Sequence, residues 1–130
     1  MSSILDIRKM RAFSMTMTVP EENIAAAEEE LKLSFSVEYR EYLLAFGCAS
    51  VYGHELTGLG ASERLDVVAV TEEERRFCPS IPNGFYVVEQ THFDDIVIWQ
   101  SESGEIFRTC CDSQPVKIFD SLYEYLAAEI

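Results

Sequence analysis

The stretch SVEYREYLLAFGCASVYGHELTGL, residues 36–59, decides the fold that the rest of the chain must complete. Ser36 can cap a helix, and Gly47 can end it, because a left-handed residue is cheap at a glycine. The apolar positions of this helix are Val37, Tyr39, Leu43, Leu44 and Phe46. Gly53 and Gly58 then flank a short strand-like run, which indicates backbone bends at the rim of a sheet. The stretch therefore predicts a helix packed beside a sheet edge.

Length and composition indicate a single domain over residues 1–130. The chain is 48% hydrophobic and 12% aromatic, which is enough to fill one core. No apolar run approaches the ~20 residues that cross a bilayer. The first residues lack the apolar core and cleavage site of a secretory signal. We therefore expect a cytoplasmic protein that does not enter membranes.

The charge balance is strongly acidic. Ten Lys and Arg residues oppose 23 Asp and Glu residues, for a formal net charge of -13. Direct binding to nucleic acid is disfavoured, because phosphates require the opposite sign. The negative field either steers a basic protein partner to the surface or only maintains solubility, and the sequence leaves both open.

The first half of the chain reads as helical. Residues 1–19 are interpreted as an N-terminal extension to the core, either a short helix or, over 15–19, a strand. A helix is expected over about residues 20–31, with its buried stripe at Ile24, Ala27 and Leu31 and a solvated face at residues 28–30. In the following helix the hydroxyls of Tyr39 and Tyr42 are expected at the margins, within reach of water or a partner.

The second half reads as strands followed by a helix. Residues 65–70 favour a strand, after which Thr71 can cap a short helix over 72–77. Further strands are expected at residues 85–90, 96–100, 105–110 and 116–119. Asp120 or Ser121 can cap a last helix with Leu122, Tyr125, Leu126 and Ile130 pointing inward. This order predicts an α+β domain.

No chemical motif is recognisable. His92 lies beside Asp94 and Asp95 in an expected turn, where acids that bond their own backbone explain the pattern best. His54 has no nucleophile placed beside it by the sequence. The cysteines, Cys48, Cys78, Cys110 and Cys111, lack zinc spacing and a disulfide framework. Calcium and phosphate-binding loops are also missing. We expect no metal, no cofactor and no catalysis.

The ordered segments resemble a known family. IAAAEEEL, SVEYREYLLAFG, YGHELTGLG, VVAVTEEERR, GFYVVEQ, IVIWQSESGEIF and KIFDSLYEYL together are similar to the SUKH superfamily, in its Smi/Knr-type branch. The likeness covers about residues 20–130. The Gly53, Glu55 and Gly58 corner is its most diagnostic element. Ser36 replaces a proline usual in the family, and Gly47-Cys48 replaces a double glycine.

This resemblance implies a central antiparallel sheet flanked by helices and a non-catalytic role. It implies an immunity protein that binds and neutralises a cognate bacterial toxin, often a nuclease. The acidic chain agrees, because opposite charge speeds association with a basic toxin. The alternative is a non-catalytic scaffold or regulatory protein-binding module of the same fold. Neither reading specifies the oligomeric state.

Candidate partner contacts follow from expected exposure. They are Tyr52, His54, Glu55, Asp94, Asp95, Trp99 and Glu102. On the strand over 96–100, Ile96, Ile98 and Gln100 share one face, and Val97 and Trp99 share the other. Trp99 is either an exposed aromatic anchor for a partner or covered by a helix.

Overall fold

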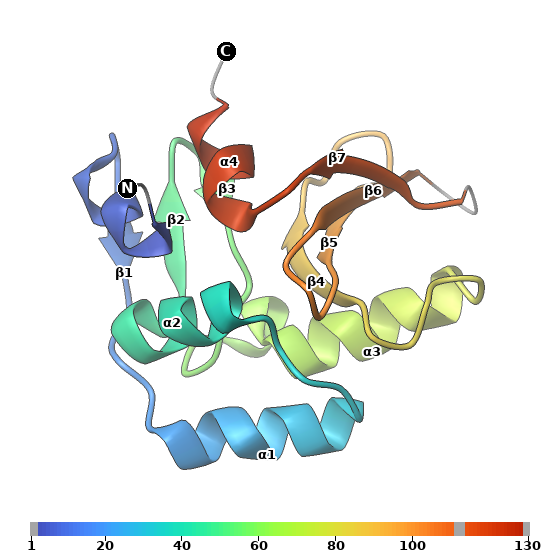
Figure 1. The fold of residues 1–130 in the computed structure, drawn as a ribbon, viewed down its shortest axis with the longest axis horizontal. Helices are drawn as coiled ribbons and strands as arrows, with labels where there is room; N and C mark the ends of the chain where they lie inside the picture. Colours follow the sequence, from blue (N-terminus) through green and yellow to red (C-terminus); the bar gives the residue numbers. More distant parts are fainter. Residues whose placement is uncertain (1–2, 111–113, 129–130) are drawn as a thin grey trace.

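The structure is a computed structural model that describes residues 3–110 and 114–128. Within these ranges the chain forms helices and antiparallel strands (Figure 1). In chain order the elements are η1 (Ile4–Lys9), β1 (Ser14–Met15), α1 (Glu21–Leu31), α2 (Val37–Phe46), β2 (Ala49–Val51), β3 (His54–Glu55), η2 (Glu63–Leu65), α3 (Val67–Phe77), β4 (Tyr86–Gln90), β5 (Ile96–Gln100), β6 (Ile106–Cys110), β7 (Val116–Phe119) and α4 (Leu122–Ala127). The α+β class predicted from the sequence is confirmed.

The strands form two antiparallel sheets where one central sheet was expected. The first has the order β1-β2-β3, and the second is the predicted meander, β4-β5-β6-β7. Strand β3 ends after two residues, and the chain then meets β4 of the second sheet through an isolated bridge between Leu56 and Glu89. The Thr57 amide donates to the Val88 carbonyl at 2.9 Å beside this bridge. The two sheets therefore meet where the chain after β3 runs beside β4.

Helix α2 begins and ends as its sequence predicts. The Ser36 hydroxyl accepts a hydrogen bond from the Tyr39 amide at 3.0 Å, and Gly47 ends the helix with φ of 70°. Gly58 packs directly on this turn. A Cβ at Gly58 would stand 2.1 Å from the Gly47 carbonyl oxygen, closer than any real contact. The pair of glycines thus lets the chain after β3 pass against the end of α2.

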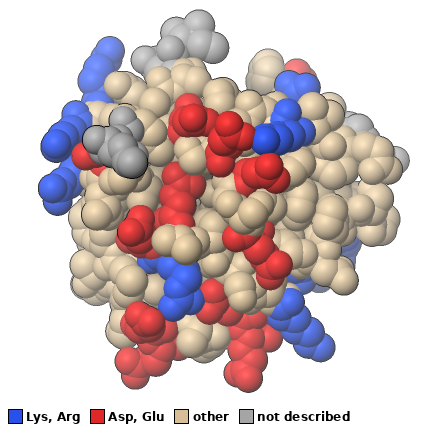
Figure 2. All heavy atoms as spheres, in the orientation of Figure 1, with Lys and Arg blue, Asp and Glu red and all other residues tan. Residues whose placement is uncertain are grey.

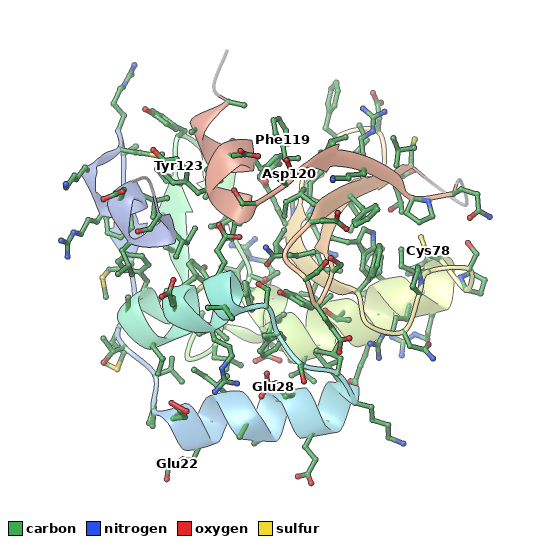
Figure 3. All side chains as sticks on the ribbon, viewed as in Figure 1. Glu22, Glu28, Cys78, Phe119, Asp120 and Tyr123 are labelled. Carbon is green, nitrogen blue, oxygen red and sulfur yellow. The ribbon has the colours of Figure 1, made fainter. Side chains whose placement is uncertain are left out.

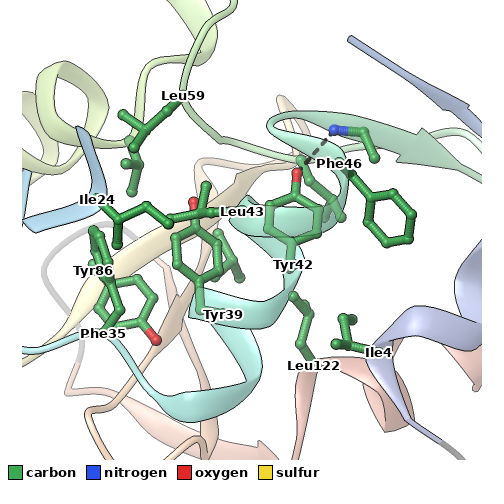
Figure 4. Close-up of a cluster of buried hydrophobic side chains, with 14 of the residues drawn as sticks. Ile4, Ile24, Phe35, Tyr39, Tyr42, Leu43, Phe46, Leu59, Tyr86 and Leu122 are labelled. Carbon is green, nitrogen blue, oxygen red and sulfur yellow. Dashed lines mark hydrogen bonds between the residues drawn. The ribbon is translucent and has the colours of Figure 1, made fainter. Parts of the chain in front are cut away.

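The tyrosines of α2 lie in the centre of the core, so their predicted place at the helix margins is wrong. Tyr39 and Tyr42 are both 0% exposed. Both lie within the cluster of buried side chains drawn in Figure 4. Tyr42 donates its hydroxyl to the Thr57 carbonyl at 2.6 Å and accepts from the Ala49 amide at 2.9 Å. Tyr39 bonds the Thr57 hydroxyl at 2.8 Å. Partners within the protein replace the water that these hydroxyls would otherwise need.

The predicted strand over residues 65–70 is instead helical: it covers the last residue of η2, the cap Asp66 and the first turn of α3. Asp66 caps this helix by accepting from the Ala69 amide at 3.0 Å, and Thr71 lies inside the helix. The Thr71 hydroxyl accepts from the Val87 amide of β4 at 3.0 Å. The valines here are buried on the helix, so tertiary packing outweighs their preference for extended backbone.

Glu28 on α1 also departs from its prediction as part of a solvated face. Its side chain is 17% exposed and lies between α1 and α2, whereas Glu22 points away from the protein (Figure 3). One oxygen of Glu28 bonds Arg40 at 2.7 Å, and the other accepts from the Phe35 amide at 2.8 Å. This acid therefore fixes the two helices to each other.

Residues before α1 contribute to the core. Ile4 and Ile7 of η1 are 1% and 0% exposed, and η1 packs on α2 and α4. The strand expected over 15–19 is limited to β1, which pairs with β2. The extension is thus integrated with the core through two isoleucines.

Helix α4 follows β7 and lies above the junction of the two sheets (Figure 1). Ser121 caps it, accepting from the Glu124 amide at 3.1 Å. Leu122 and Leu126 are buried as predicted, and Tyr125 is half-buried. Ile130, also predicted to point inward, lies outside the described residues.

Candidate functional site

Three of the candidate contact residues share one hairpin. Tyr52 and Gly53 connect β2 to β3 with φ of 54° and 82°, so both central residues are left-handed, as a type I′ turn requires. His54 and Glu55 follow directly in β3. The turn therefore presents Tyr52, His54 and Glu55 together at the edge of the first sheet.

His54 belongs to a polar cluster beneath this hairpin. Its Nδ1 lies 2.9 Å from Glu89 Oε1, and the Tyr125 hydroxyl donates to the same oxygen at 2.5 Å. Glu89 is only 6% exposed. Burial, followed by the charge of Glu89, raises the pKa of Tyr125. The cluster joins β3, β4 and α4 around one buried carboxylate.

A bulge in β4 points Glu89 into this cluster. Val87 faces the side of the sheet that carries Trp99, and strict alternation would send Glu89 to that side as well. The register with β5 shifts between Val87 and Glu89, which re-aims the carboxylate toward His54 and Tyr125. The sequence carries no signal for this shift.

Glu55 makes a surface ion pair. Arg64 of η2 donates through both terminal nitrogens to the two carboxylate oxygens of Glu55, each at 2.8 Å. These hydrogen bonds hold the pKa of Glu55 below its usual value. The bidentate pair keeps this acid ionised and fixes its orientation on the hairpin.

The remaining acidic candidates lie at opposite ends of β5. Asp94 and Asp95 are exposed in the β4–β5 turn, where both have positive φ. Glu102 follows β5 in the β5–β6 turn, and its Oε2 accepts from the Ser34 amide at 2.7 Å. The structure therefore does not bring these three acids together.

Trp99 is not an exposed anchor. Its side chain is 0% exposed and lies in a second apolar cluster with Val70 of α3 and Val87 of β4. The indole nitrogen donates to the Thr109 hydroxyl at 2.9 Å. Trp99 is therefore covered rather than exposed, because α3 and the loop after it pack on this face of the sheet.

A groove of about 490 Å³ runs between the start of α2 and the start of α4, and we call it the α2–α4 groove. Its lining comes from four separate parts of the chain. The lining residues are Ser3, Ile4, Ser36, Val37, Glu38, Glu41, Glu102, Ser103, Gly104, Asp120 and Ser121. Four of these are acids, and none is Lys, Arg or His.

Glu38 closes one side of the groove by capping α4 from another helix. Its Oε1 accepts from the Leu122 amide at 2.7 Å and from Gln100 at 2.8 Å, and its Oε2 accepts from the Tyr123 amide at 2.9 Å. Asp120 and Tyr123 lie where β7 passes into α4 (Figure 3). The partial positive charge at the start of α4 is thus satisfied by Glu38.

A second acidic groove, of about 420 Å³, lies between α1 and α3 and is called the α1–α3 groove. Its lining residues are Asn23, Ala26, Ala27, Glu30, Leu59, Glu63, Asp66, Val68, Ala69 and Glu72. A neighbouring hollow of about 510 Å³ shares part of this lining but also contains Arg64 and Arg76. Asp and Glu side chains run across the face of the protein from α4 to α1 (Figure 2).

Two absences apply to residues 3–110 and 114–128. No three His, Cys, Asp or Glu side chains in these ranges converge in a way that could hold a metal ion. None of the helices described there combines the length and the apolar character that crossing a bilayer needs.

Comparison with known families agrees with this geometry. A SUKH family model, described as SMI1-KNR4 cell-wall, matches residues 21–126. The chain belongs to the SUKH superfamily. No curated protein matches this SUKH chain. The matched region starts at α1 and ends in α4, so it includes both sheets except β1 and leaves out η1.

Sequence reasoning missed several residues of this SUKH surface. Glu38, Glu41 and Asp120 line the α2–α4 groove but were not predicted as partner contacts. The sequence does place Glu38 and Glu41 about one helical turn apart, on one side of a helix. Only the fold, however, shows that Glu102 lies near them. Glu89 and Tyr125 were interpreted only as parts of a strand and a helix, because the bonds of Glu89 to His54 and to Tyr125 depend on the bulge.

Proposed function

We propose that this protein is an immunity protein that binds a cognate toxin with a basic surface and neutralises it, a nuclease being the class that fits best. Membership of the SUKH superfamily supports this, because domains of this type occur in toxin-immunity systems. The observation that carries the proposal is the charge of -13 combined with two grooves whose linings hold acids and no basic residue.

Electrostatics explains how such a protein would act. A nuclease presents Lys and Arg to phosphates, and the same surface attracts a strongly acidic protein. Long-range attraction raises the association rate, and closer contacts then set specificity. The exposed acids Glu55, Asp94, Asp95 and Glu102 remain predicted contacts, as do Tyr52 and His54 on the hairpin. The proposal places this action in the cytoplasm.

Co-expression with the product of the adjacent gene tests the proposal. We expect that product to stop growth alone, and this protein to restore growth and to co-purify with it. The association rate of the purified pair should fall as salt rises, because screening weakens exposed charges. A toxic neighbour that is neither neutralised nor bound would refute the immunity role.

The same experiment identifies the alternative. A neighbouring product that co-purifies but never impairs growth would indicate a scaffold or regulatory protein-binding module. The dose of this protein in the same assay also tests whether the polar cluster of His54, Glu89 and Tyr125 acts catalytically. Neutralisation by stoichiometric binding predicts that rescue requires at least one copy of this protein per toxin, whereas an enzyme would act below that ratio.

A further inference from the structure

We propose that the α2–α4 groove receives a lysine or arginine side chain of the protein partner, with the aliphatic stem against Val37 and the charged end beside Glu41. This rests on the proposed function, because it names the part of the surface that meets the basic partner. The groove has the volume for a long side chain, about 490 Å³. Segments distant in the chain form its walls, so it exists only in the folded protein.

The apolar half of the groove is formed by Val37. At 76% exposure it is the most exposed large hydrophobic side chain in the described part of the chain. Ile4, which also lines the groove, is 1% exposed and fixes η1 against the core below. Val37 is the first residue of α2, a position that the helix does not require to be apolar. Covering it with an aliphatic stem removes apolar surface from water.

The acidic half has a carboxylate ready to pair. The Glu41 carboxylate forms no hydrogen bond or ion pair with any residue that the structure describes. Glu102 uses one oxygen on the Ser34 amide, and Asp120 pairs with Lys117 at 2.7 Å outside the groove lining. Glu38 is fully engaged in capping α4. Glu41 is therefore the primary partner for an incoming cation, with Glu102 and Asp120 adding to the field.

A basic side chain fits the lining of the α2–α4 groove better than a metal ion does. The lining also differs from an acidic surface that attracts cations through charge alone. A metal needs converging ligands, and no such group occurs in the described ranges. Lysine and arginine combine an apolar stem with a charged end, as the groove combines Val37 with Glu41. The α1–α3 groove is equally acidic, but its apolar members are alanines and the buried Leu59 and Val68. It supplies the matched control.

The test is a titration of the ¹⁵N-labelled protein with an acetylated and amidated Leu-Lys-Leu peptide at low salt. We expect saturable shifts confined to amides lining the groove, among them Val37, Glu41, Gly104 and Ser121. Glu41→Gln should weaken binding roughly two- to fivefold, the size expected for loss of one exposed ion pair. Val37→Ser should also weaken it, whereas Glu30→Gln in the α1–α3 groove should leave it unchanged. A Leu-Glu-Leu peptide should not bind.

Two results would overturn the proposal. One is that the groove amides show no saturable shifts, either because no amide shifts at all or because the shifts are spread over the whole acidic surface. The other is equal binding by the Val37→Ser and Glu41→Gln variants and the unchanged protein. The growth assay separates this idea from the immunity role. Full rescue by a Val37→Ser, Glu41→Gln double variant with undiminished toxin affinity refutes the groove alone, and groove binding without rescue refutes immunity alone.

Discussion

Both faces of the sheet formed by β4–β7 carry buried side chains, but the two faces are stabilised in different ways. The tyrosine face, toward α2, carries Tyr86, Ile98, Gln100 and Ile106, and the tryptophan face, toward α3, carries Val87, Val97, Trp99 and Phe107. On the tyrosine face the Tyr86 hydroxyl lies 2.9 Å from Gln100 Oε1 and accepts from the Ser36 amide at 3.0 Å. Among the described residues, the tryptophan face has fewer such bonds, from the Trp99 indole to the Thr109 hydroxyl and from the Val87 amide to the Thr71 hydroxyl of α3.

This difference separates two sources of stability. The tyrosine face joins α2, the chain after β3 and β4 through buried hydrogen bonds, which are directional and costly to leave unmade. The tryptophan face depends on filled volume around one large side chain. Deleting volume should therefore damage the second face most, and deleting a single hydroxyl should damage the first.

The largest effect is expected from Trp99→Ala. Truncating a fully buried indole leaves a cavity under α3, and the free energy of unfolding should fall by about 3–5 kcal/mol. Urea unfolding followed by circular dichroism measures this. Trp99→Phe keeps most of the volume and should cost less. A loss for Trp99→Ala below about 1 kcal/mol would show that this face is not closely packed.

A smaller effect is expected from Tyr42→Phe, which removes one oxygen from the core. The Thr57 carbonyl and the Ala49 amide would each lose a buried partner, for a loss of about 1–3 kcal/mol. Tyr123→Phe is the control, because Tyr123 is half-buried and its hydroxyl bonds none of the described residues. This variant should change stability by less than about 0.5 kcal/mol. Equal unfolding curves for both variants would contradict a hydrogen-bonded tyrosine face.

Local signals were enough to predict much of this fold. The cap at Ser36 and the turn at Gly47 depend on residues adjacent in the chain, and both are confirmed. Short polar segments separate the strands of the second sheet along the chain, so the order and pairing of these strands could also be predicted. What these elements share is that sequence neighbours determine them.

Features that depend on distant residues were predicted poorly. The valines of residues 67–70 favour a strand locally, but the Asp66 cap and burial against β4 make them helical. Tyr42 reads as a marginal hydroxyl until Thr57 is placed beside it. The candidate contacts divide in the same way. Tyr52, His54 and Glu55 share one hairpin because they are neighbours in the chain, whereas the α2–α4 groove needs four separate segments to meet.

Alkaline pH should act on the tyrosine side of the core, and Cys48 gives the smallest and most specific effect. Burial, followed by the charge of Glu55, raises the pKa of the Cys48 thiol to about 11, and burial also raises the pKa of Tyr39, Tyr42 and Tyr86. In the unfolded chain the thiol loses its proton near pH 8.5, about its usual pKa. Above that pH the unfolded state therefore gains stability, while the folded thiol stays protonated until about pH 11.

The Cys48→Ala variant isolates this contribution. Between about pH 7 and about pH 9.5 the unchanged protein should lose on the order of 1 kcal/mol more stability than the variant. Subtracting the difference at neutral pH removes the effect of the smaller side chain. Urea unfolding at a series of pH values measures the slopes, and parallel slopes would show that the thiol near Tyr42 is not kept protonated by burial. A steeper slope for the unchanged protein would instead link alkaline unfolding to the tyrosine side of the core, since Cys48 borders Tyr42 and the tryptophan face lies on the other side of the sheet.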